Sequence, residues 1–398
     1  MEIKDRYTLK DKLKAMGPGI LVVGSFIGPG TVTSATKAGA GYGYALLWTV
    51  VFSVIAVIVM QEMAARLGIV TQNGLAEELV KDLSDRPPLK WLMVALVAAA
   101  ITLGGFAYMG GDLTGTAIGL SAITGIPSNI IAPIWGCCIL VIINIGDAVK
   151  SLEKLLSVCV SVMAIVFVVT MIVVKPDLGT VFSGALPSVP EGSIMTCVSL
   201  IGTTVVPYNM FIHATSSRKT WHDPKQLPLA RFDTTVSMII GGLITGSVMI
   251  TAGTVMRGME VNSAIDMAVQ LEPFLAMGLI AAGISSAVIT PLGVSYVLAG
   301  LFGWEMNKKD KRFFWTNIAV VVAGIIVAAT GFNPIWIIMT AQAVNGIFLP
   351  IIVFTLVYVT SRSRVMGQYK NSMIQNVLGA AVFLISLVIG INSLTSLF

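Results

Sequence analysis

The chain has 398 residues, of which 56% are hydrophobic and only 11% are charged, and its mean hydropathy is +0.88. Soluble domains carry about 25% charged residues, so this composition excludes a soluble protein and indicates one surrounded mostly by lipid. Lys and Arg outnumber Asp and Glu by 25 to 20, a balance that membrane topology explains without a nucleic-acid partner.

The chain starts with a charged amphipathic arm, residues 1–16, in which we find no cleavage site of a removable signal peptide. Long uncharged runs then predict about eleven transmembrane helices in a single all-α membrane domain, residues 17–398. The predicted spans are 17–39, 43–67, 90–111, 128–146, 150–174, 193–217, 232–256, 273–303, 312–330, 334–360 and 372–396. The segment VNSAIDMAVQLEP, residues 261–273, predicts a short surface helix before the eighth span.

The basic residues orient these spans. All of the Lys and Arg residues except Lys37, Lys175 and Arg257 fall in the N-terminal arm or beside the loops that follow even-numbered spans. Because loops rich in Lys and Arg stay in the cytoplasm, we predict a cytoplasmic N-terminus. An odd number of spans then places the C-terminus outside the cell.

Two spans carry helix-breaking residues in matching local sequence. Gly24-Ser-Phe-Ile-Gly-Pro29 in the first span and Gly202-Thr-Thr-Val-Val-Pro207 in the sixth share the form G-[ST]-x-[IV]-x-P at an offset of 178 residues. A proline removes a helical hydrogen bond, and the glycines around it, Gly30 among them, allow the chain to leave helical angles. Since five helices separate the two motifs, the second unit is inverted relative to the first. This is the pattern of transporters built from inverted repeats, here 17–174 and 193–360 with an extra helix at 372–396.

The residues at the two breaks are neutral oxygen donors. Ser25, Thr31, Thr33 and Ser34 surround the first break, and Thr203, Thr204, Tyr208 and Asn209 surround the second. Soft transition metals prefer sulfur or imidazole, whereas Mg²⁺ dehydrates reluctantly and usually keeps several waters. Hydroxyls, an amide and freed backbone carbonyls therefore favour an ion that retains its hydration shell.

A few other polar residues lie within the predicted spans or close to their ends. Asp112 closes the predicted third span, and an ionisable residue at membrane depth is a functional candidate, although it could equally cap or pair at a helix end. His213 could relay protons but more often such a histidine is a packing residue. Gln342 either joins helices or faces the site.

At these residues the chain resembles the Nramp family of divalent-metal transporters along nearly its whole length. GPGT followed by VTSATKAGAGYGYALLW is similar to the family's DPGN segment and its continuation, and IGTTVVPYNMFIHATSSR is similar to the sixth span with its MPH motif. The segments AARLGIVTQNGLAEEL and DLTGTAIGLSAITGIP are similar to the second span with its following loop and to the third-to-fourth connection. The resemblance implies the LeuT-type fold with discontinuous first and sixth helices. It carries over the Thr203 carbonyl, the Gln342 amide and His213.

The departures from the family pattern concern the metal ligands. The family's Asp of DPGN is Gly28 here and its Asn is Thr31; its Met before the proline is Val206, and its His after the proline is Tyr208. On the third span, Asp112 matches the second acid of the family's pair and Met109 replaces the first. The same departures are those of the Nramp-related magnesium transporters, and the loss of two bulky ligands implies a wider pocket.

The sequence therefore predicts a secondary transporter that imports hydrated Mg²⁺, and also Mn²⁺, by alternating access without proton coupling. The predicted ion contacts are Gly28, Thr31, Asp112, Thr203, Val206, Tyr208, Asn209 and Gln342, with the helix breaks at Pro29, Gly30 and Pro207 and a possible relay at His213. We expect no enzymatic activity and no cofactor other than the transported ion, and a monomer working in the plasma membrane of a prokaryote.

Three alternatives stay open at this point. A proton-coupled Mn²⁺ or Fe²⁺ transporter of ordinary Nramp type would need a sulfur ligand, with Met210 or Met109 as stand-ins. The same fold could carry an amino acid or amine. A membrane enzyme or a passive channel is disfavoured, because we find no nucleophile–base pair and because an inverted pair of units is typical of a carrier.

Overall fold

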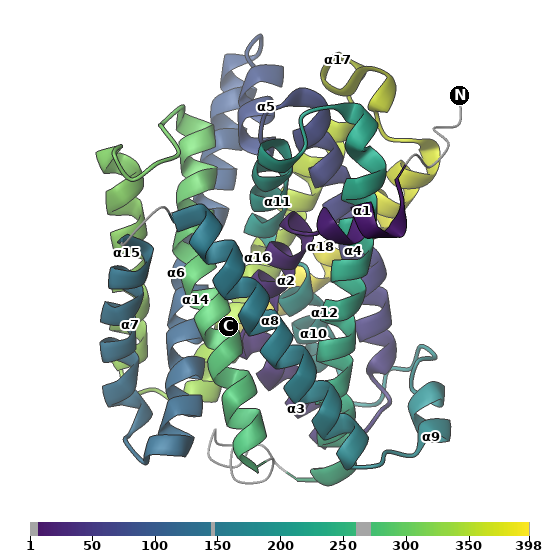
Figure 1. Cartoon of the computed structure of the whole chain (residues 1–398), viewed down its shortest axis with the longest axis vertical. Helices are drawn as coiled ribbons and strands as arrows, with labels where there is room; N and C mark the ends of the chain where they lie inside the picture. The colour runs from purple at the N-terminus through teal and green to yellow at the C-terminus, as the bar shows by residue number, and fades with distance from the viewer. Residues whose placement is uncertain (1–6, 145–147, 260–271, 398) are drawn as a thin grey trace.

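The structure is a computed structural model and describes residues 7–144, 148–259 and 272–397. Every regular element in these ranges is a helix (Figure 1). The long helices are α2 (Pro18–Phe26), α3 (Pro29–Tyr42), α4 (Leu47–Thr71), α6 (Pro87–Thr124), α7 (Ser128–Asn144), α8 (Ala148–Val173), α10 (Ile194–Thr204), α11 (Pro207–Thr220), α12 (Leu227–Val255), α14 (Glu272–Phe302), α15 (Lys311–Ala329), α16 (Pro334–Ser361) and α18 (Met373–Leu397). Short helices are α1 (Leu9–Lys14), α5 (Leu75–Asp82), α9 (Leu178–Ser183) and α17 (Ser363–Met366), with 3-10 turns at η1 (Pro224–Gln226) and η2 (Gly367–Tyr369).

Each of the eleven predicted spans corresponds to a helix or to a pair of half-helices. Within the described ranges, nine helical stretches are long and apolar enough to cross a membrane, the bent pair α2–α3 makes a tenth, and α7 is a shorter apolar helix of 17 residues. The predicted surface helix at 261–273 falls almost entirely on residues outside the described ranges.

Helix α6 differs most from its predicted bounds. The expected span ended at residue 111, but α6 runs for 38 residues to Thr124, where Gly125 adopts a left-handed conformation with φ of 74°. The Gly-Gly-Asp sequence at 110–112 suggests the end of a helix, but the glycines of this stretch instead allow neighbouring helices to pack closely. A β-carbon on Gly110 would lie 2.7 Å from Val327 of α15, and one on Gly115 would lie 2.0 Å from Pro29 of α3.

The half-helices form the centre of the bundle and the remaining helices surround them. The most apolar window of the α10–α11 span is 83% buried inside the protein, whereas the corresponding windows of α15 and α18 are 33% buried. In Figure 1, α7 and α15 lie at one edge, next to α6. About two thirds of the residues in these windows of α15 and α18 are therefore not covered by the protein, whereas the polar residues at the breaks of the half-helices are buried.

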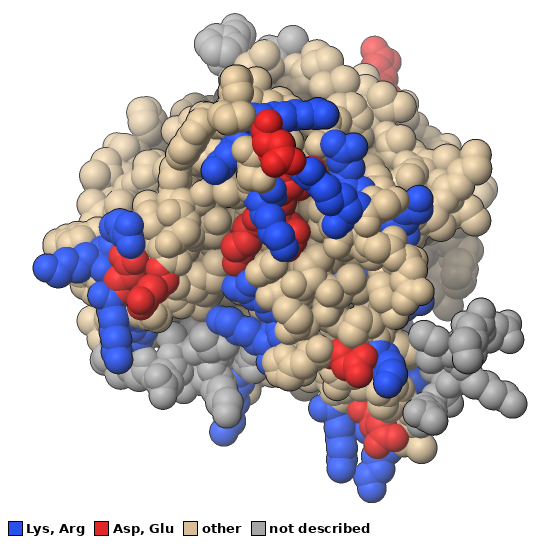
Figure 2. All heavy atoms as spheres, turned by 90° about the horizontal axis from the view of Figure 1, so that it is seen from above, with Lys and Arg blue, Asp and Glu red and all other residues tan. Residues whose placement is uncertain are grey.

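The two ends of the bundle differ in charge. Ion pairs join α5 and the loop after it to α11 and α17: Arg218 of α11 contacts Glu77 at 2.9 Å, and Arg364 of α17 contacts Asp82 at 3.0 Å and Asp85 at 2.7 Å. Figure 2 shows this end, which we call the basic end, with Lys and Arg side chains around acidic ones. At the same end, Glu62 and Arg66, one turn apart on α4, pair at 3.2 Å.

The opposite end gathers α9 with the segments before α4 and after α12. Trp48 donates from its indole nitrogen to the Ser188 carbonyl at 2.6 Å, and Tyr44 and Thr254 join through their hydroxyls at 2.7 Å. Arg257, one of the three basic residues expected on this side, lies here, 3.5 Å from the position of a β-carbon on Gly43. The division of basic residues between the two ends therefore matches the predicted loop order.

Candidate metal-ion site

Proline interrupts the first and sixth spans where the sequence predicts. Pro29 is the first residue of α3 and Pro207 is the first residue of α11. Neither has an N–H, so the carbonyls four residues earlier, on Ser25 and Thr203, have no helical donor. The first break bends the chain by 59°, whereas α10 and α11 still read as one span of 27 residues. The predicted discontinuities are therefore present, and the first is the sharper one.

The protein itself bonds several of the groups freed at the first break. The Ser25 carbonyl accepts a bond from Ser286 Oγ of α14 at 3.5 Å, and the Phe26 carbonyl accepts one from the Thr31 hydroxyl at 2.5 Å. The Gly28 carbonyl accepts the Val32 N–H at 3.2 Å. In this conformation, the predicted contacts Thr31 and Gly28 therefore stabilise the break, and each keeps only its remaining lone pairs for a water molecule.

Hydrogen bonds join the half-helices on both sides of the breaks. Towards the basic end, Ser25 Oγ of α2 donates to Asn209 Oδ1 of α11 at 2.6 Å. Towards the opposite end, Ser34 Oγ of α3 and Ser199 Oγ of α10 lie 2.7 Å apart. All four side chains are buried. One hydrogen bond therefore joins the half-helices on each side of the breaks in this conformation.

Asp112 lies in the middle of α6, and the prediction that it closes a span is wrong. The α6 backbone continues for twelve residues beyond it, to Thr124. Its Oδ2 accepts a bond from Thr290 Oγ1 of α14 at 2.9 Å. Its Oδ1 lies 3.3 Å from the position that a β-carbon on Gly28 would take. The carboxylate therefore reaches the first break from a neighbouring helix.

The space next to Gly28 is filled rather than open. A β-carbon at this position would lie 2.9 Å from Ser286 Oγ, in addition to the contact with Asp112. Val206, which stands where the family has Met, is fully buried. The wider pocket that the loss of the family's Asp and Met implies is thus taken up by α6 and α14 in this conformation.

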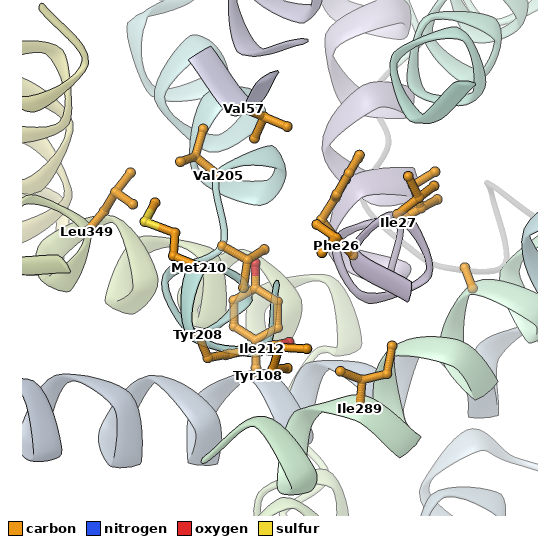
Figure 3. Packing of buried hydrophobic residues seen from close by; sticks show 14 of the residues in the cluster. Phe26, Ile27, Val57, Tyr108, Val205, Tyr208, Met210, Ile212, Ile289 and Leu349 are labelled. Carbon is orange, nitrogen blue, oxygen red and sulfur yellow. The ribbon is translucent and has the colours of Figure 1, made fainter. Parts of the chain in front are cut away.

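Two tyrosines line the breaks. Tyr208 of α11 and Tyr108 of α6 meet edge to face with ring centroids 6.0 Å apart, as Figure 3 shows together with Phe26 of α2 and Ile289 of α14. The Tyr208 hydroxyl lies 3.1 Å from Thr290 Oγ1, and the Tyr108 hydroxyl donates to Gln342 Oε1 at 2.7 Å. The phenol ring of Tyr208 is thus held next to Thr290 and Tyr108, beside the second break.

Gln342 of α16 lies next to the first break. Its oxygen is bonded to Tyr108, and its nitrogen would lie 1.8 Å from a β-carbon on Gly30. The amide nitrogen of Asn209, by contrast, is buried and has no hydrogen-bond partner among the residues that the structure describes. A buried amide without a partner costs about 1–3 kcal/mol, so this N–H₂ group is the one most ready to bond a further oxygen.

The sulfur atoms proposed as stand-ins point elsewhere. Met109 packs on α15, where a β-carbon on Gly324 would lie 2.4 Å from its Cγ. Met210 lies beside Val205 and Leu349 in Figure 3. A sulfur that the sequence analysis missed is Met339 of α16, which accepts bonds from Ser34 at 3.8 Å and from Ser199 at 3.9 Å.

His213 lies on α11, six residues after Pro207. Its Nδ1 is 3.0 Å from Gln61 Oε1 of α4, and its Nε2 is buried without a hydrogen-bond partner in the described part of the chain. Because an amide oxygen accepts only, Nδ1 carries the proton and Nε2 has a free lone pair. The ring therefore contacts α4 rather than the breaks.

The sequence analysis also missed Ser286 and Thr290 of α14 and Tyr108 of α6. The first two are spaced i,i+4 in an apolar span, which places both hydroxyls on one helix face. That spacing was a usable signal. Within the described residues, no group of three or more His, Cys, Asp or Glu side chains has the arrangement of a metal site, so any ion here would be held mainly by neutral oxygens and the single carboxylate of Asp112.

Comparisons with known proteins agree with this fold. A family model described as "Natural resistance-associated macrophage protein-like" matches residues 19–396. The chain is 27% identical over 408 residues to the divalent metal cation transporter MntH of Aeromonas hydrophila, covering 96% of this chain and 95% of that protein. It is 24% identical to the natural resistance-associated macrophage protein 2 homolog of Dictyostelium discoideum, covering 98% of this chain but 64% of that longer relative.

Solved structures show the same architecture. A manganese transporter of Eremococcus coleocola superposes with a TM-score of 0.81 at 21% identity, covering 99% of this chain and 88% of that one. MhsT in complex with L-phenylalanine superposes with a TM-score of 0.59 at 17% identity, covering 96% of this chain and 98% of that one. The fold is the LeuT type with discontinuous first and sixth helices. The chain therefore belongs to the Nramp family of divalent-metal transporters.

Proposed function

We propose that the protein imports divalent cations, chiefly Mg²⁺ and also Mn²⁺, as largely hydrated ions, by alternating access and without proton coupling. The ion would sit between residues 28–31 and 203–209. The predicted contacts at the breaks, with Gln342 and Asp112, form the site in this proposal. The observation that carries it is the donor set: hydroxyls, amides and one carboxylate surround the breaks. Among the described residues, the sulfur of Met339 approaches the half-helices only at Ser34 and Ser199, five and eight residues away from Pro29 and Pro207.

A hydrated ion fits this donor set. Each water of the ion offers two hydrogens, which carbonyl and hydroxyl lone pairs such as those of Thr203 and Tyr208 accept. Asp112 supplies a negative charge next to Gly28 without a second carboxylate beside it. A bare Ca²⁺ prefers six to eight oxygen ligands, several of them carboxylates, whereas Mg²⁺ keeps several of its waters.

The two hydrogen bonds on either side of the breaks support alternating access. An ion can leave towards the basic end only if α2 and α11 separate, which breaks the Ser25–Asn209 bond. It can leave towards the opposite end only if α3 and α10 separate, which breaks the Ser34–Ser199 bond. Each pair joins different half-helices, so one side can open while the other stays shut.

The absence of proton coupling follows from two replacements. Gly28 removes the carboxylate at the first break, and Met109 removes the first acid of α6. With these two acids gone, we expect the membrane potential to drive uptake, and a dication gains about 4.6 kcal/mol per 100 mV because each charge gains about 2.3.

The setting of the transporter is part of the same proposal. We place it in the plasma membrane of a prokaryote as a monomer, with the basic end and the N-terminus in the cytoplasm and the C-terminus outside. A tag on the C-terminus that reacts with an impermeant reagent in intact cells is the expected result. A tag that reacts only after the cells are opened would contradict the orientation.

The second candidate is proton-coupled Mn²⁺ transport of the ordinary type, as the names of the relatives suggest. Met339 favours it more than Met109 or Met210 does, because its sulfur faces the half-helices α3 and α10. Micromolar binding of Cd²⁺, which prefers soft ligands, together with its loss in Met339→Leu, would support this candidate over the first.

The deciding experiment is Mg²⁺ and Mn²⁺ flux into proteoliposomes that contain a pH reporter. We expect saturable uptake of both ions that grows with an inside-negative potential, and no acidification of the lumen. Acidification in step with uptake would overturn the claim about coupling. Uptake of Mn²⁺ without uptake of Mg²⁺, together with competition between Cd²⁺ and Mn²⁺ for one site, would overturn the choice of Mg²⁺ as the main ion.

A matched variant restores the family's ligands. Gly28→Asp alone would force a β-carbon to within 2.9 Å of Ser286 Oγ, so the variant should combine Gly28→Asp and Val206→Met with Ser286→Ala. Ser286→Ala alone is the control. We expect the triple variant to lose Mg²⁺ transport and to bind Mn²⁺ and Cd²⁺ more tightly, because it regains a carboxylate and a thioether.

A further inference from the structure

We propose that Thr290 of α14 is a positioning residue for the ion site: it holds the Asp112 carboxylate towards the first break and links it to the Tyr208 hydroxyl. This inference rests on the proposed function, because it assigns a residue that sets the geometry of the same site. Thr290 has no counterpart among the contacts that the sequence predicts.

Three side chains from three helices form a hydrogen-bonded chain with Thr290 in the middle. Thr290 Oγ1 lies 2.9 Å from Asp112 Oδ2 of α6 and 3.1 Å from the Tyr208 hydroxyl of α11. All three side chains are buried. Because the three side chains are shielded inside the bundle, each donor and acceptor depends on the others.

The direction of these bonds follows from the number of protons. Thr290 has one hydroxyl hydrogen, and its oxygen also lies 3.0 Å from the Ser286 carbonyl one turn earlier. Hydrogen bonds to a carboxylate are stronger than those to a neutral carbonyl, so Thr290 donates to Asp112. Tyr208 must then donate to Thr290, which leaves the phenol oxygen as an acceptor.

The arrangement fixes the orientation of the Asp112 carboxylate, so that one of its two equivalent oxygens faces the ion. Oδ2 is held by Thr290, and Oδ1 lies on the side of the first break, 3.3 Å from the β-carbon position of Gly28. Rotation of the carboxylate would break the bond to Thr290. The Tyr208 oxygen, polarised through Thr290 by the same charge, is correspondingly a better acceptor for a water hydrogen.

Thr290 differs from other buried threonines of the bundle. A threonine in a membrane helix commonly donates to the carbonyl four residues earlier, as Thr355 of α16 does to Ile351 at 2.7 Å. Thr355 is as buried as Thr290, with no exposed side-chain surface in either case. Thr290 in addition reaches a charged group and a tyrosine on two other helices.

The test is uptake of Mg²⁺ by proteoliposomes with Thr290→Val, Thr290→Ser and, as the matched control, Thr355→Val. Thr290→Val keeps the shape and removes the hydroxyl. A hydrogen bond to a charged group is worth enough for a change of about tenfold or more, so we expect the KM for Mg²⁺ to rise about tenfold with a smaller change in the maximal rate. Thr290→Ser should restore the KM, and Thr355→Val should leave it unchanged.

A double-mutant cycle separates positioning from a general effect on folding. Asp112→Asn alone should raise the KM, and adding Thr290→Val to it should change the KM little further, because the group to be positioned is already lost. Additive effects of the two substitutions would overturn the inference, and so would a Thr290→Val protein with the wild-type KM. If Asp112→Asn itself leaves uptake unchanged, the proposed site is wrong and not only the role of Thr290.

A second pair of variants keeps the inference testable if Thr290→Val does not fold. Tyr208→Phe removes the hydroxyl that contacts Thr290 and leaves Thr290 in place. Coupling between Tyr208→Phe and Asp112→Asn is expected, because the two residues communicate through Thr290. Independent effects of these two substitutions would overturn the inference.

Discussion

The side chain of Gln342 occupies the space next to Gly30 so fully that a β-carbon on Gly30 would come within 1.8 Å of Gln342 Nε2. The Gln342 oxygen is at the same time bonded to Tyr108. The amide therefore cannot turn away without losing that bond. Helices α16 and α6 are thus fitted against the first break through one side chain.

Gly30→Ala should abolish transport, because the added methyl group overlaps the Gln342 amide. Combining Gly30→Ala with Gln342→Ala should restore part of the lost stability, because removing the amide makes space for the added methyl group. The control is Gly41→Ala in the same helix, where a β-carbon would meet no atom within 4 Å. Thermal unfolding of the purified proteins in detergent measures the effect, and a Gly30→Ala protein as stable as Gly41→Ala would contradict it.

Gly28→Ala should have a milder effect than Gly30→Ala. Its β-carbon would lie 2.9 Å from the Ser286 hydroxyl, a small group that can rotate, and 3.3 Å from Asp112 Oδ1. We expect a higher KM for Mg²⁺ and relief of that effect in Gly28→Ala combined with Ser286→Ala. Gly24→Ala, whose nearest contact would be an ordinary 3.4 Å, serves as the comparison in the flux assay.

His213→Gln should leave the pH dependence of Mg²⁺ uptake unchanged. His213 contacts Gln61 on α4 and not the residues of the breaks, and the proposed mechanism moves no proton. Flux measured between about pH 6 and pH 8, the range in which histidines usually titrate, is the readout. A wild-type pH profile that flattens in His213→Gln would show that the ring carries protons.

The pair of Arg364 with Asp85 at the basic end gives a pH dependence outside the membrane. The hydrogen bond and charge of Arg364 lower the pKa of the Asp85 carboxyl below its ordinary value of 3.8. A carboxyl with a lowered pKa stabilises the folded state above its ordinary pKa, and the contribution is lost as the pH falls through the lowered value.

The unfolding temperature of the wild type should therefore exceed that of Asp85→Asn at neutral pH, and the difference should vanish in strong acid. Because Asp85 is exposed, the effect should be small and should shrink in high salt. Glu191→Gln, which removes an exposed carboxylate elsewhere on the protein, is the control for a general change of charge. A difference that grows as the pH falls would contradict this reading.

The helix breaks could be predicted from the sequence because proline acts through its own backbone. Pro29 and Pro207 remove an N–H wherever they stand, and the repeated local motif identified them as a pair. The number and order of the spans were predictable for a similar reason, since about 20 apolar residues cross a bilayer. The two breaks agree with the structure. Each predicted span falls on a helix or a pair of half-helices, although within the described residues only nine or ten of these stretches are long and apolar enough to cross a membrane.

The neighbours of the breaks were not predictable in the same way. Whether Gly110 ends a helix or lets another helix approach depends on α15, which lies far away in the sequence. In the sequence, nothing distinguishes Ser286 and Thr290 from serines and threonines whose hydroxyls bond a carbonyl of their own helix. Only the packing of α14 against α6 brings Thr290 to Asp112. Such partners come from tertiary packing that one sequence does not encode locally.

The two half-helices of the first span, α2 and α3, also affect the order in which the protein folds in the membrane. Ser25 and Ser34 find their bonding partners on α11, α10 and α14, all of which leave the ribosome long after α2 and α3. Until then the interrupted segment holds unpaired polar groups in lipid, which is costly. The first span should therefore reach its final structure last although it is synthesised first. A chain that ends after the first repeat should be recognised and degraded by membrane quality control.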